Sequence, residues 1–469
     1  MKKRVLIWAS FFLILFLGYS LYLHKDTGDQ ATYMTSQSCA NCHSEHYQSW
    51  HKTLHPIMFL PVTDPRAKLL GDFASGDPAV TFKPEDVEFV VGSKWEQVYV
   101  RRIEGEYYPL PAKWLVMQKR WVPYKVKDWK ETPMSYKCNG CHTTGFDPKT
   151  TEFSEFGIGC EACHGPGSLH VQHEQLEHKK VCQLCHGTPE HPDIDSNGHH
   201  IITSVAPSVC AQCHNRGTSS ESASDGGAPV TFSFPTQATP GGDMGKNWQA
   251  LTKKQDKKGK YWWGQGVSKN RHQEYADWNQ SGHANALKNL HANYVEGGDR
   301  GKLSAECLHC HATDYRLAKE GMKPNLEQAR HGVTCVACHN PHGFDKKVSS
   351  MHTDGTAPCA DCHIDSIARV IQTSNGKHTP CPTGVVGCAD CHMPRIVKTG
   401  GFFSLRSHAF RIIPPEISTL EEMPNSCQNG GCHEDRSLQW ADKAFKKHYI
   451  EYDHQVGDIT NSPTTSLKP

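Results

Sequence analysis

One short pattern, Cys-x-x-Cys-His, occurs nine times in this chain of 469 residues. It is the attachment sequence for a c-type haem: two thiols bond to the porphyrin edge, and the adjacent histidine binds the iron from below. Zinc ribbons, a redox dithiol and a disulfide framework are the alternatives. Zinc sites do not need the following histidine, however, and a redox dithiol needs only one motif. The repetition therefore predicts a chain that folds around covalently bound haems.

Each motif supplies two attachment cysteines and one proximal iron ligand, and we expect a helical turn to carry or follow it. Four motifs fall within the stretch from Cys138 to His214, and four more lie between Cys307 and His392. In chain order, the predicted sites are Cys39, Cys42 and His43; Cys138, Cys141 and His142; Cys160, Cys163 and His164; Cys182, Cys185 and His186; Cys210, Cys213 and His214; Cys307, Cys310 and His311; Cys335, Cys338 and His339; Cys359, Cys362 and His363; Cys388, Cys391 and His392.

A tenth, longer site is predicted at Cys427, Cys432 and His433, where four residues separate the cysteines. Its two glycines allow the longer loop to fold back, so that both sulfurs still reach the porphyrin. Trp440 follows His433 by seven residues, as Trp50 follows His43. The total is then ten c-type haems (heme c). In the alternative, Cys427 pairs with the remaining Cys381, which leaves a singly attached haem or none.

Extra histidines are plentiful enough for a second imidazole on every iron. Of 31 histidines, ten are proximal, which leaves 21. His55 follows Tyr47 and Trp50 at the same spacing at which His283 follows Tyr275 and Trp278. We interpret this repeat as a haem-ligand helix that occurs twice, with His55 and His283 as distal ligands.

The N-terminus predicts export. Three basic residues precede an uncharged apolar run at residues 5–23, long enough to cross a bilayer core. By the positive-inside rule, the body of the chain is extracytoplasmic. We expect residues 1–24 to be an uncleaved anchor in the inner membrane, with the cysteine-rich body in the periplasm; a cleaved signal peptide followed by export as a soluble protein is the alternative.

The predicted fold class is mainly α with extensive irregular loops, organised around packed haems. A small β-hairpin insert is expected at about 80–115, between the first and second haem, because apolar runs flank the turn at Glu104–Glu106. We predict an N-terminal pentahaem domain at 25–214, a linker at 215–262 and a C-terminal pentahaem domain at 263–469. The outlying haems near His43 and His433 are candidates for electron input and output.

Composition excludes two classes of function. The formal net charge is +1 and there is no nucleic-acid-binding motif, so a nucleic-acid partner is not expected. A glycine-rich phosphate loop is also absent from the sequence, so no nucleotide site is predicted. Apolar residues make up only 37% of the chain, which suggests that porphyrins replace part of the usual core.

The opening motif with Tyr47, Trp50 and His55 resembles the multihaem cytochrome c superfamily, which includes nitrification-type tetrahaem cytochromes, octahaem tetrathionate reductases, hydroxylamine oxidoreductases and ammonia-forming nitrite reductases. Three further segments resemble parts of these proteins in which a later histidine ligates a haem. The resemblance implies distal roles for His170, after the motif at Cys160; His342, after that at Cys335; and His408, after that at Cys388. It carries over haem binding and electron transfer, but no particular reaction.

Two functions follow from these features. The first is a conduit that passes electrons through mostly bis-histidine haems, from a quinol oxidoreductase or cytochrome to a terminal acceptor in anaerobic-type respiration. It needs no catalytic residue. The second is a terminal oxidoreductase of a nitrogen or sulfur oxyanion (nitrite, hydroxylamine, tetrathionate or sulfite), which needs one haem with an open distal position. The arginines that could hold such an anion are Arg101, Arg102, Arg316, Arg330 and Arg395.

Overall fold

The computed structural model describes residues 31–171, 204–222, 227–264, 266–296, 303–343, 359–363, 381 and 387–453. The chain divides into two compact units, one of Met1–Met34 and His164–Thr203, the other of Thr35–Cys163 and Ser204–Pro469. In the first unit, the N–H of Ser168 donates to the carbonyl of Thr32 at 3.2 Å, and the N–H of Thr32 donates to Oγ of Ser168 at 2.7 Å.

The predicted anchor at residues 5–23 lies outside the described residues. Within the described residues, we find no helix that combines the length and apolar character needed to cross a bilayer.

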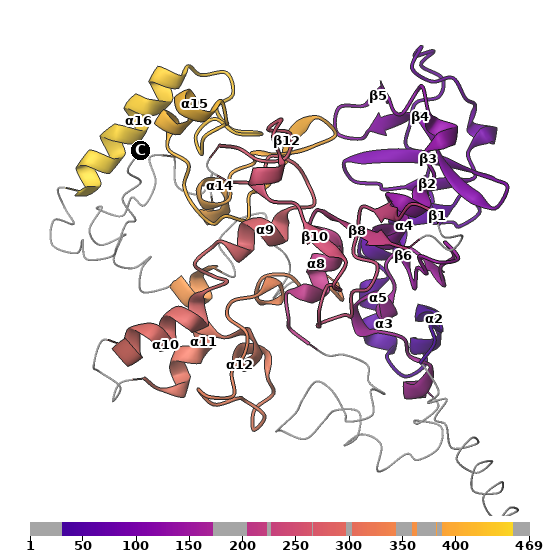
Figure 1. Ribbon diagram of the computed structural model, residues 1–469. Coiled ribbons are helices and arrows are strands. Elements are labelled where there is room, and N and C mark those ends of the chain that lie inside the picture. Colours follow the sequence, from indigo (N-terminus) through magenta and orange to yellow (C-terminus); the bar gives the residue numbers. More distant parts are fainter. Residues whose placement is uncertain are drawn as a thin grey trace, which may run out of the picture. The chain divides into compact units, whose positions relative to one another are not determined.

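A five-stranded antiparallel sheet, in the order β1-β2-β3-β4-β5, fills the interval between the first and second motifs (Figure 1). β3 (Glu96–Ile103) and β4 (Glu106–Leu115) pair as the predicted hairpin. Glu104 and Gly105 both have positive φ, as a two-residue hairpin turn requires. The other strands are β1 (Phe59–Pro61), β2 (Phe89–Val91) and β5 (Arg120–Pro123). The insert is therefore larger than the expected hairpin.

This sheet has an apolar core on both faces. Because side chains alternate along a strand, Tyr99 and Val100 of β3 point to opposite sides. Tyr99 packs with Leu60, Trp114 and Trp121, and Val100 packs in a second cluster. That second cluster also holds Phe59, Val91, Tyr107 and Met134.

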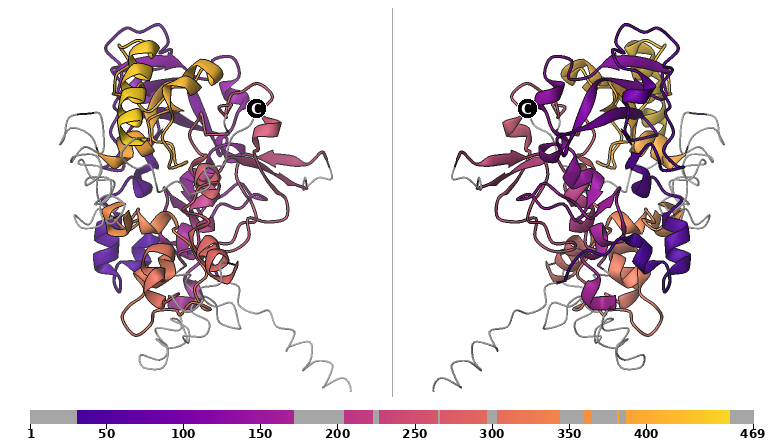
Figure 2. Two further views of the ribbon diagram at one scale, coloured as in Figure 1. Left: turned by 90° about the vertical axis from the view of Figure 1, so that its left-hand side faces the viewer. Right: turned by 90° about the vertical axis from the view of Figure 1, so that its right-hand side faces the viewer.

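Three smaller sheets stabilise the loops around the motifs. A three-stranded sheet in the order β10-β8-β9 lies in the segment that was expected to be a linker (Figure 2). Its strands are β8 (Gly217–Glu221), β9 (Val230–Phe232) and β10 (Trp248–Ala250). Two-stranded sheets pair β6 (Thr143–Thr144) with β7 (Glu155–Phe156), and β11 (Val397–Thr399) with β12 (Phe402–Leu405).

The helices are mostly one or two turns long, too short to be stable in isolation, so they depend on packing. The α-helices are α2 (Ser36–Cys39), α3 (Ser44–Trp50), α4 (Asn139–His142), α5 (Cys160–His164), α8 (Ser208–His214), α9 (Glu274–Asn279), α10 (Ala286–Glu296), α11 (Leu308–His311), α12 (Thr313–Leu317), α14 (Cys388–His392), α15 (Pro415–Glu421) and α16 (Leu438–Asp453). The 3-10 turns are η1 (His55–Ile57), η2 (Pro84–Asp86), η3 (Trp129–Glu131), η4 (Met134–Tyr136), η5 (Lys253–Gln255), η7 (Ala305–Cys307) and η8 (Cys335–Ala337).

The prediction of a mainly α fold is wrong. Helices account for 30% of the structure and strands for 16%, in several antiparallel sheets. A haem motif needs only one turn of helix, so a high density of motifs does not imply long helices. The residues between motifs are stabilised instead by short antiparallel pairings.

An ion cluster around the buried Glu96 connects the five-stranded sheet to the segment that precedes α9. The carboxylate of Glu96, on β3, pairs with Nζ of Lys113 at 2.6 Å and with the guanidinium of Arg271. Burial raises the pKa of Glu96, but Arg271 and Lys113 outweigh burial, and the pKa lies below its ordinary value of 4.5. The ionised carboxylate therefore stabilises the folded state.

We predict that Glu96→Gln lowers the free energy of unfolding by about 2 kcal/mol at pH 7, because charged hydrogen bonds are lost. A depressed folded-state pKa gives stability that is present above the unfolded value and lost as pH falls through the folded value. The difference from the wild type should therefore shrink on acidification, as measured by guanidinium denaturation of the holoprotein. Glu88→Gln, which alters an exposed pair with Arg101, is the control and should have little effect. An equal loss of unfolding free energy at pH 7 and at acidic pH would contradict this account.

Candidate haem-binding sites

In the motifs, the chain turns once and brings the histidine back to the first cysteine. The N–H of His43 donates to the carbonyl of Cys39 at 2.9 Å, and that of His339 donates to Cys335 at 2.9 Å. Five α-helices end at the motif histidine: those at His142, His164, His214, His311 and His392. The expected helical turn is thus confirmed at these motifs, and it places thiols and imidazole within one turn of each other.

The longer motif closes the same turn. The N–H of His433 donates to the carbonyl of Cys427 at 3.1 Å. The additional residues are accommodated at Gly430 and Gly431. Gly431 has a φ of +92°, and a Cβ on Gly430 would lie 1.8 Å from the carbonyl oxygen of Phe403. Glycine at both positions lets the longer segment present its cysteines and histidine as the shorter motifs do.

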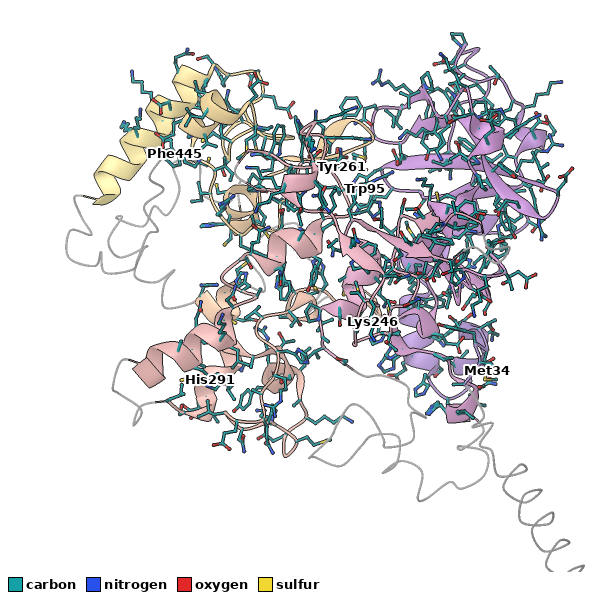
Figure 3. All side chains as sticks on the ribbon, in the orientation of Figure 1. Met34, Trp95, Lys246, Tyr261, His291 and Phe445 are labelled. Atoms are coloured by element: carbon teal, nitrogen blue, oxygen red, sulfur yellow. The ribbon has the colours of Figure 1, made fainter. Side chains whose placement is uncertain are left out.

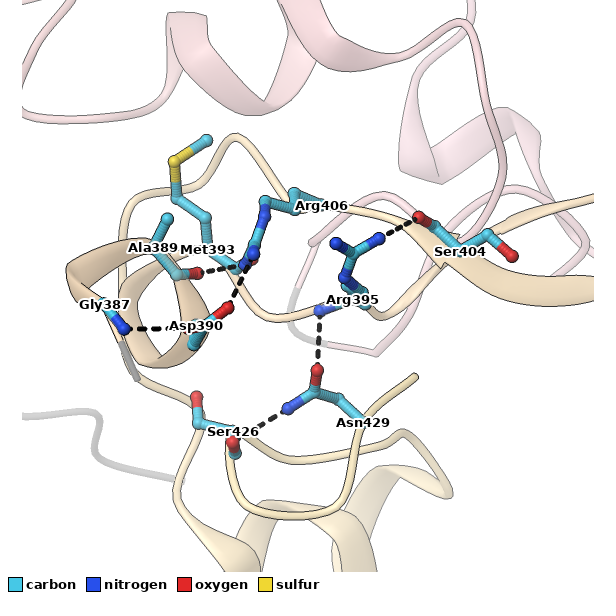
Figure 4. A network of polar contacts seen from close by, with 9 residues as sticks. All are labelled: Gly387, Ala389, Asp390, Met393, Arg395, Ser404, Arg406, Ser426 and Asn429. Carbon is cyan, nitrogen blue, oxygen red and sulfur yellow. Dashed lines mark hydrogen bonds and ion pairs between the residues drawn. The ribbon is translucent and has the colours of Figure 1, made fainter. Parts of the chain in front are cut away.

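Arg406 fixes the helix α14 that carries the ninth motif (Figure 4). Its guanidinium donates to the carbonyls of Ala389 at 2.6 Å and Met393 at 3.2 Å, and it pairs with Asp390 at 2.6 Å. The guanidinium thereby binds two carbonyls of α14 and its C-cap; that of Ala389 also accepts from the N–H of Met393 at 3.0 Å.

Asn429, inside the longer motif, ties that motif to the ninth (Figure 4). Its side-chain oxygen accepts from the N–H of Arg395 at 3.0 Å, and its amide donates to the carbonyl of Ser426 at 2.8 Å. The hydroxyl of Ser426 donates to the carbonyl of Cys391 at 2.8 Å. The two motifs are consequently held side by side.

One hydrogen-bonded frame connects an aromatic helix with two haem motifs. In its first copy, the indole N–H of Trp50 donates to the carbonyl of Ile158 at 3.0 Å. The N–H of Ile158 donates back to the carbonyl of His55 at 2.9 Å. The hydroxyl of Thr144, two residues after a proximal histidine, donates to the carbonyl of Gly157 at 2.9 Å. These contacts fix the segment that leads into the motif at Cys160.

The second copy repeats these contacts between other residues. The indole N–H of Trp278 donates to the carbonyl of Val333 at 2.8 Å, and the N–H of Val333 donates to the carbonyl of His283 at 3.1 Å. The hydroxyl of Thr313 donates to the carbonyl of Gly332 at 2.8 Å. The predicted repeat is therefore a duplicated structural unit. In the first copy, the five-stranded sheet is inserted after the repeat histidine.

Cysteines of different motifs meet in pairs. The thiols that lie beside one another are Cys39 and Cys160, Cys141 and Cys213, Cys210 and Cys335, Cys310 and Cys362, and Cys359 and Cys388. Further neighbours are Cys163 with Cys213, Cys338 with Cys359, and Cys391 with Cys427. Because each thiol is a point of haem attachment, the rings that these cysteines carry must be neighbours too. The nine motifs in the described residues thus form one connected set.

Two predicted distal histidines face predicted proximal ones. The ring centres of His283 and His363 are 6.1 Å apart, and those of His339 and His408 are 6.2 Å apart. Two imidazoles whose nitrogens each lie about 2 Å from one metal ion have ring centres roughly 6 Å apart. Both pairs have the spacing expected of axial ligands on one iron.

Asp277 positions the segment that carries His408. Its carboxylate, which is 2% exposed, accepts from the hydroxyl of Ser407 at 3.1 Å and from the N–H of His408 at 3.2 Å. The N–H and hydroxyl of Ser268 donate to its other oxygen at 2.8 and 2.7 Å. The sequence reasoning missed Asp277, as it missed Thr144 and Thr313. The available signal was a threonine two residues after the proximal histidine in two motifs: Thr144 after His142, and Thr313 after His311.

The residues around the motifs fit a haem. Buried polar atoms without a hydrogen-bond partner among the described residues include Nδ1 of His142, Nε of Arg216 and Oγ1 of Thr334. Protein atoms leave 51% of the side chain of His214 uncovered. Burial lowers the pKa of His142 and His339 to about 4. Both are then neutral, which is the form that binds a metal.

Other predicted site residues lie apart from these contacts. His46, on α3, has its ring centre 5.0 Å from that of His342. His164 and His170 belong to the first unit. The motif Cys182, Cys185 and His186 lies outside the described residues. Cys381 lies beside Cys391 and Cys427, near the longer motif.

Comparison with protein families finds two matches. The family described as "Cytochrome c554 and c-prime" matches residues 116–165 and 269–340, which hold motifs of both copies of the frame. The family described as "Doubled CXXCH motif" matches residues 327–368. Among curated proteins, none matches the chain.

Two solved structures are similar. The outer cell wall cytochrome OcwA is 28% identical, with a TM-score of 0.70 over 88% of this chain and 86% of that one. The undecahaem cytochrome from the S-layer of Carboxydothermus ferrireducens is 20% identical, with a TM-score of 0.46 over 89% of this chain and 60% of that one. The matched families, the OcwA structure and the repeated motif geometry agree: the chain binds haem c through Cys-x-x-Cys-His motifs and is a multihaem c-type cytochrome.

Proposed function

We propose that the protein is a decahaem electron conduit in anaerobic-type respiration. The observation that carries this proposal is the connected set of cysteine contacts between motifs. Electrons pass between haems whose edges are neighbours, so a continuous set of attachment points supports continuous transfer. An electron conduit needs no substrate pocket.

The two outlying motifs serve as electron input and output in this proposal. Cys42 and His43 are exposed, and so are Cys432 and His433 at the other end. The ring of Trp440 lies 4.6 Å from that of His433 and is itself 38% exposed. A redox partner protein, a quinol oxidoreductase or another cytochrome, could approach a haem edge at either site.

Bis-histidine ligation supports transfer rather than catalysis. We propose His283 and His408 as distal ligands to the irons of His363 and His339, on the ring spacings given above. His55, His170 and His342 are proposed distal ligands of other haems. A six-coordinate iron changes its ligands little on reduction, which favours fast exchange.

We place the protein outside the cytoplasm. The apolar run at residues 5–23 supports attachment to the inner membrane, with the haem-bearing body in the periplasm or beyond. The similar OcwA is named as an outer cell wall cytochrome, which supports an extracytoplasmic site of action. Cell fractionation with haem staining tests this location.

The tenth site is tested by intact-mass measurement of the holoprotein. We expect ten haems in the wild type and nine in Cys432→Ser, because the longer motif closes the same turn as the others. Cys381→Ser is the matched control and should retain ten. If the wild type carries nine, or if Cys381→Ser loses a haem, the longer motif is not an independent attachment site.

The conduit is tested by electron paramagnetic resonance of the ferric protein. We expect low-spin centres only, unchanged on addition of nitrite or hydroxylamine. His408→Ala should convert one centre to high spin, because it removes one axial imidazole, whereas His309→Ala should not. A high-spin signal in the wild type that responds to these ligands, together with turnover, would favour the oxyanion oxidoreductase instead.

A further inference from the structure

A carboxylate with one buried oxygen lies next to the outer nitrogen of one proximal histidine. Oε2 of Glu274, the first residue of α9, lies 3.4 Å from Nδ1 of His214. This oxygen is buried, and the described residues offer it no hydrogen-bond donor of regular geometry. When Nε2 of a histidine binds a metal, Nδ1–H remains to donate to an outer partner. Glu274 is placed to be that partner.

Two other proximal histidines, His311 and His142, have different surroundings at Nδ1. Nδ1 of His311 lies 3.1 Å from the carbonyl oxygen of Ala286. Nδ1 of His142 has no hydrogen-bond partner among the described residues. A carbonyl is a weaker acceptor than a carboxylate and carries no net charge. Within the described residues, these three haem sites therefore present three different surroundings to the imidazole.

The duplicated frame provides an internal comparison. Glu274 precedes the repeat tyrosine of the second copy, and His46 precedes that of the first. His46 faces His43, the proximal histidine of the preceding motif, with ring centres 6.5 Å apart. At this helix position the second copy therefore has a carboxylate beside a proximal histidine, whereas the first has an imidazole whose ring lies nearer His342 than His43.

We propose that Glu274 lowers the reduction potential of the His214 haem by accepting a hydrogen bond from the ligating imidazole. An anionic acceptor makes the imidazole a stronger donor and stabilises the ferric state, and hydrogen bonding around the axial ligand is an established control of potential. Glu274 is a positioning residue, since it acts through His214.

Because of where this haem lies, a lower reduction potential has a consequence for electron transfer. That consequence rests on the electron-transfer function proposed above. Cys213 meets cysteines of the motifs at Cys138 and Cys160, and Cys210 meets Cys335 of the second copy. Among the motifs that the structure describes, the one at His214 consequently links those of the two copies, and its haem lies at this link. A lower potential at this link makes electrons reside on either side of it rather than on it.

The test is a potentiometric titration of the holoprotein, followed by optical and paramagnetic resonance spectra. Glu274→Gln keeps an acceptor oxygen but removes the charge. We expect one centre to become easier to reduce, with its ratio of reduced to oxidised iron at a fixed potential raised about tenfold, which for one electron is about 59 mV. Haem content and low-spin signals should stay as in the wild type. Glu306→Gln, an exposed carboxylate beside the motif at Cys307, is the matched control and should shift no centre.

Unchanged potentials in Glu274→Gln would overturn the proposal, as would an equal small shift of every centre. If Glu274→Gln loses a haem, Glu274→Asp becomes the test, because it retains the charge. The proposal then requires the reduction potential of the His214 haem to stay near the wild-type value. A high-spin, catalytically active wild type would contradict the conduit while leaving the Glu274 shift measurable, so the two failures are distinguishable.

Discussion

The structure depends on one constraint: a haem attached at two sulfurs must also receive a nitrogen from below. A single backbone turn satisfies this, with the histidine N–H bonded to the carbonyl of the first cysteine. The same closure occurs at Cys39, at Cys335 and, with two more residues, at Cys427. Everything outside that turn is free to vary, which explains why sheets, loops and short helices all occur around the motifs.

Polar contacts hold such turns in place together with apolar packing, since Cys138 and Cys307 pack against buried apolar clusters. The described apolar clusters lie on both faces of the five-stranded sheet and beside α10 and β11. Near the motifs, the stabilising residues are Asp277, Arg406 and the two frame threonines, each bonded to backbone atoms. Side-chain bonds to backbone groups supplement the apolar packing there. Covalently held rings supply the rest of the interior.

The sequence was sufficient to predict what local spacing determines. The motif turns, the hairpin of β3 and β4 and the repeated Tyr-Trp-His helix all depend on residues close in the chain. It was not sufficient for the fold class, because strand pairs as short as Thr143–Thr144 with Glu155–Phe156 leave no periodic pattern. Nor did it predict that Asp277 would meet Ser407, 130 residues later, since that contact depends on how the segments pack. The contact between Glu274 and His214 likewise depends on how the segments pack, so the sequence did not predict it either.

Duplication explains how one chain can contain like sites with unlike properties. The frame of Trp50, Ile158 and His55 recurs as Trp278, Val333 and His283, with hydrogen bonds that differ by no more than 0.2 Å. A frame bonded largely through backbone carbonyls tolerates substitution at positions that do not contribute to it. His46 and Glu274 stand at one such position, against different proximal histidines. Because the backbone geometry is conserved between the copies while the charge next to the iron ligand is not, the frame fixes where each haem lies and the outer residue is left to set how readily it accepts an electron.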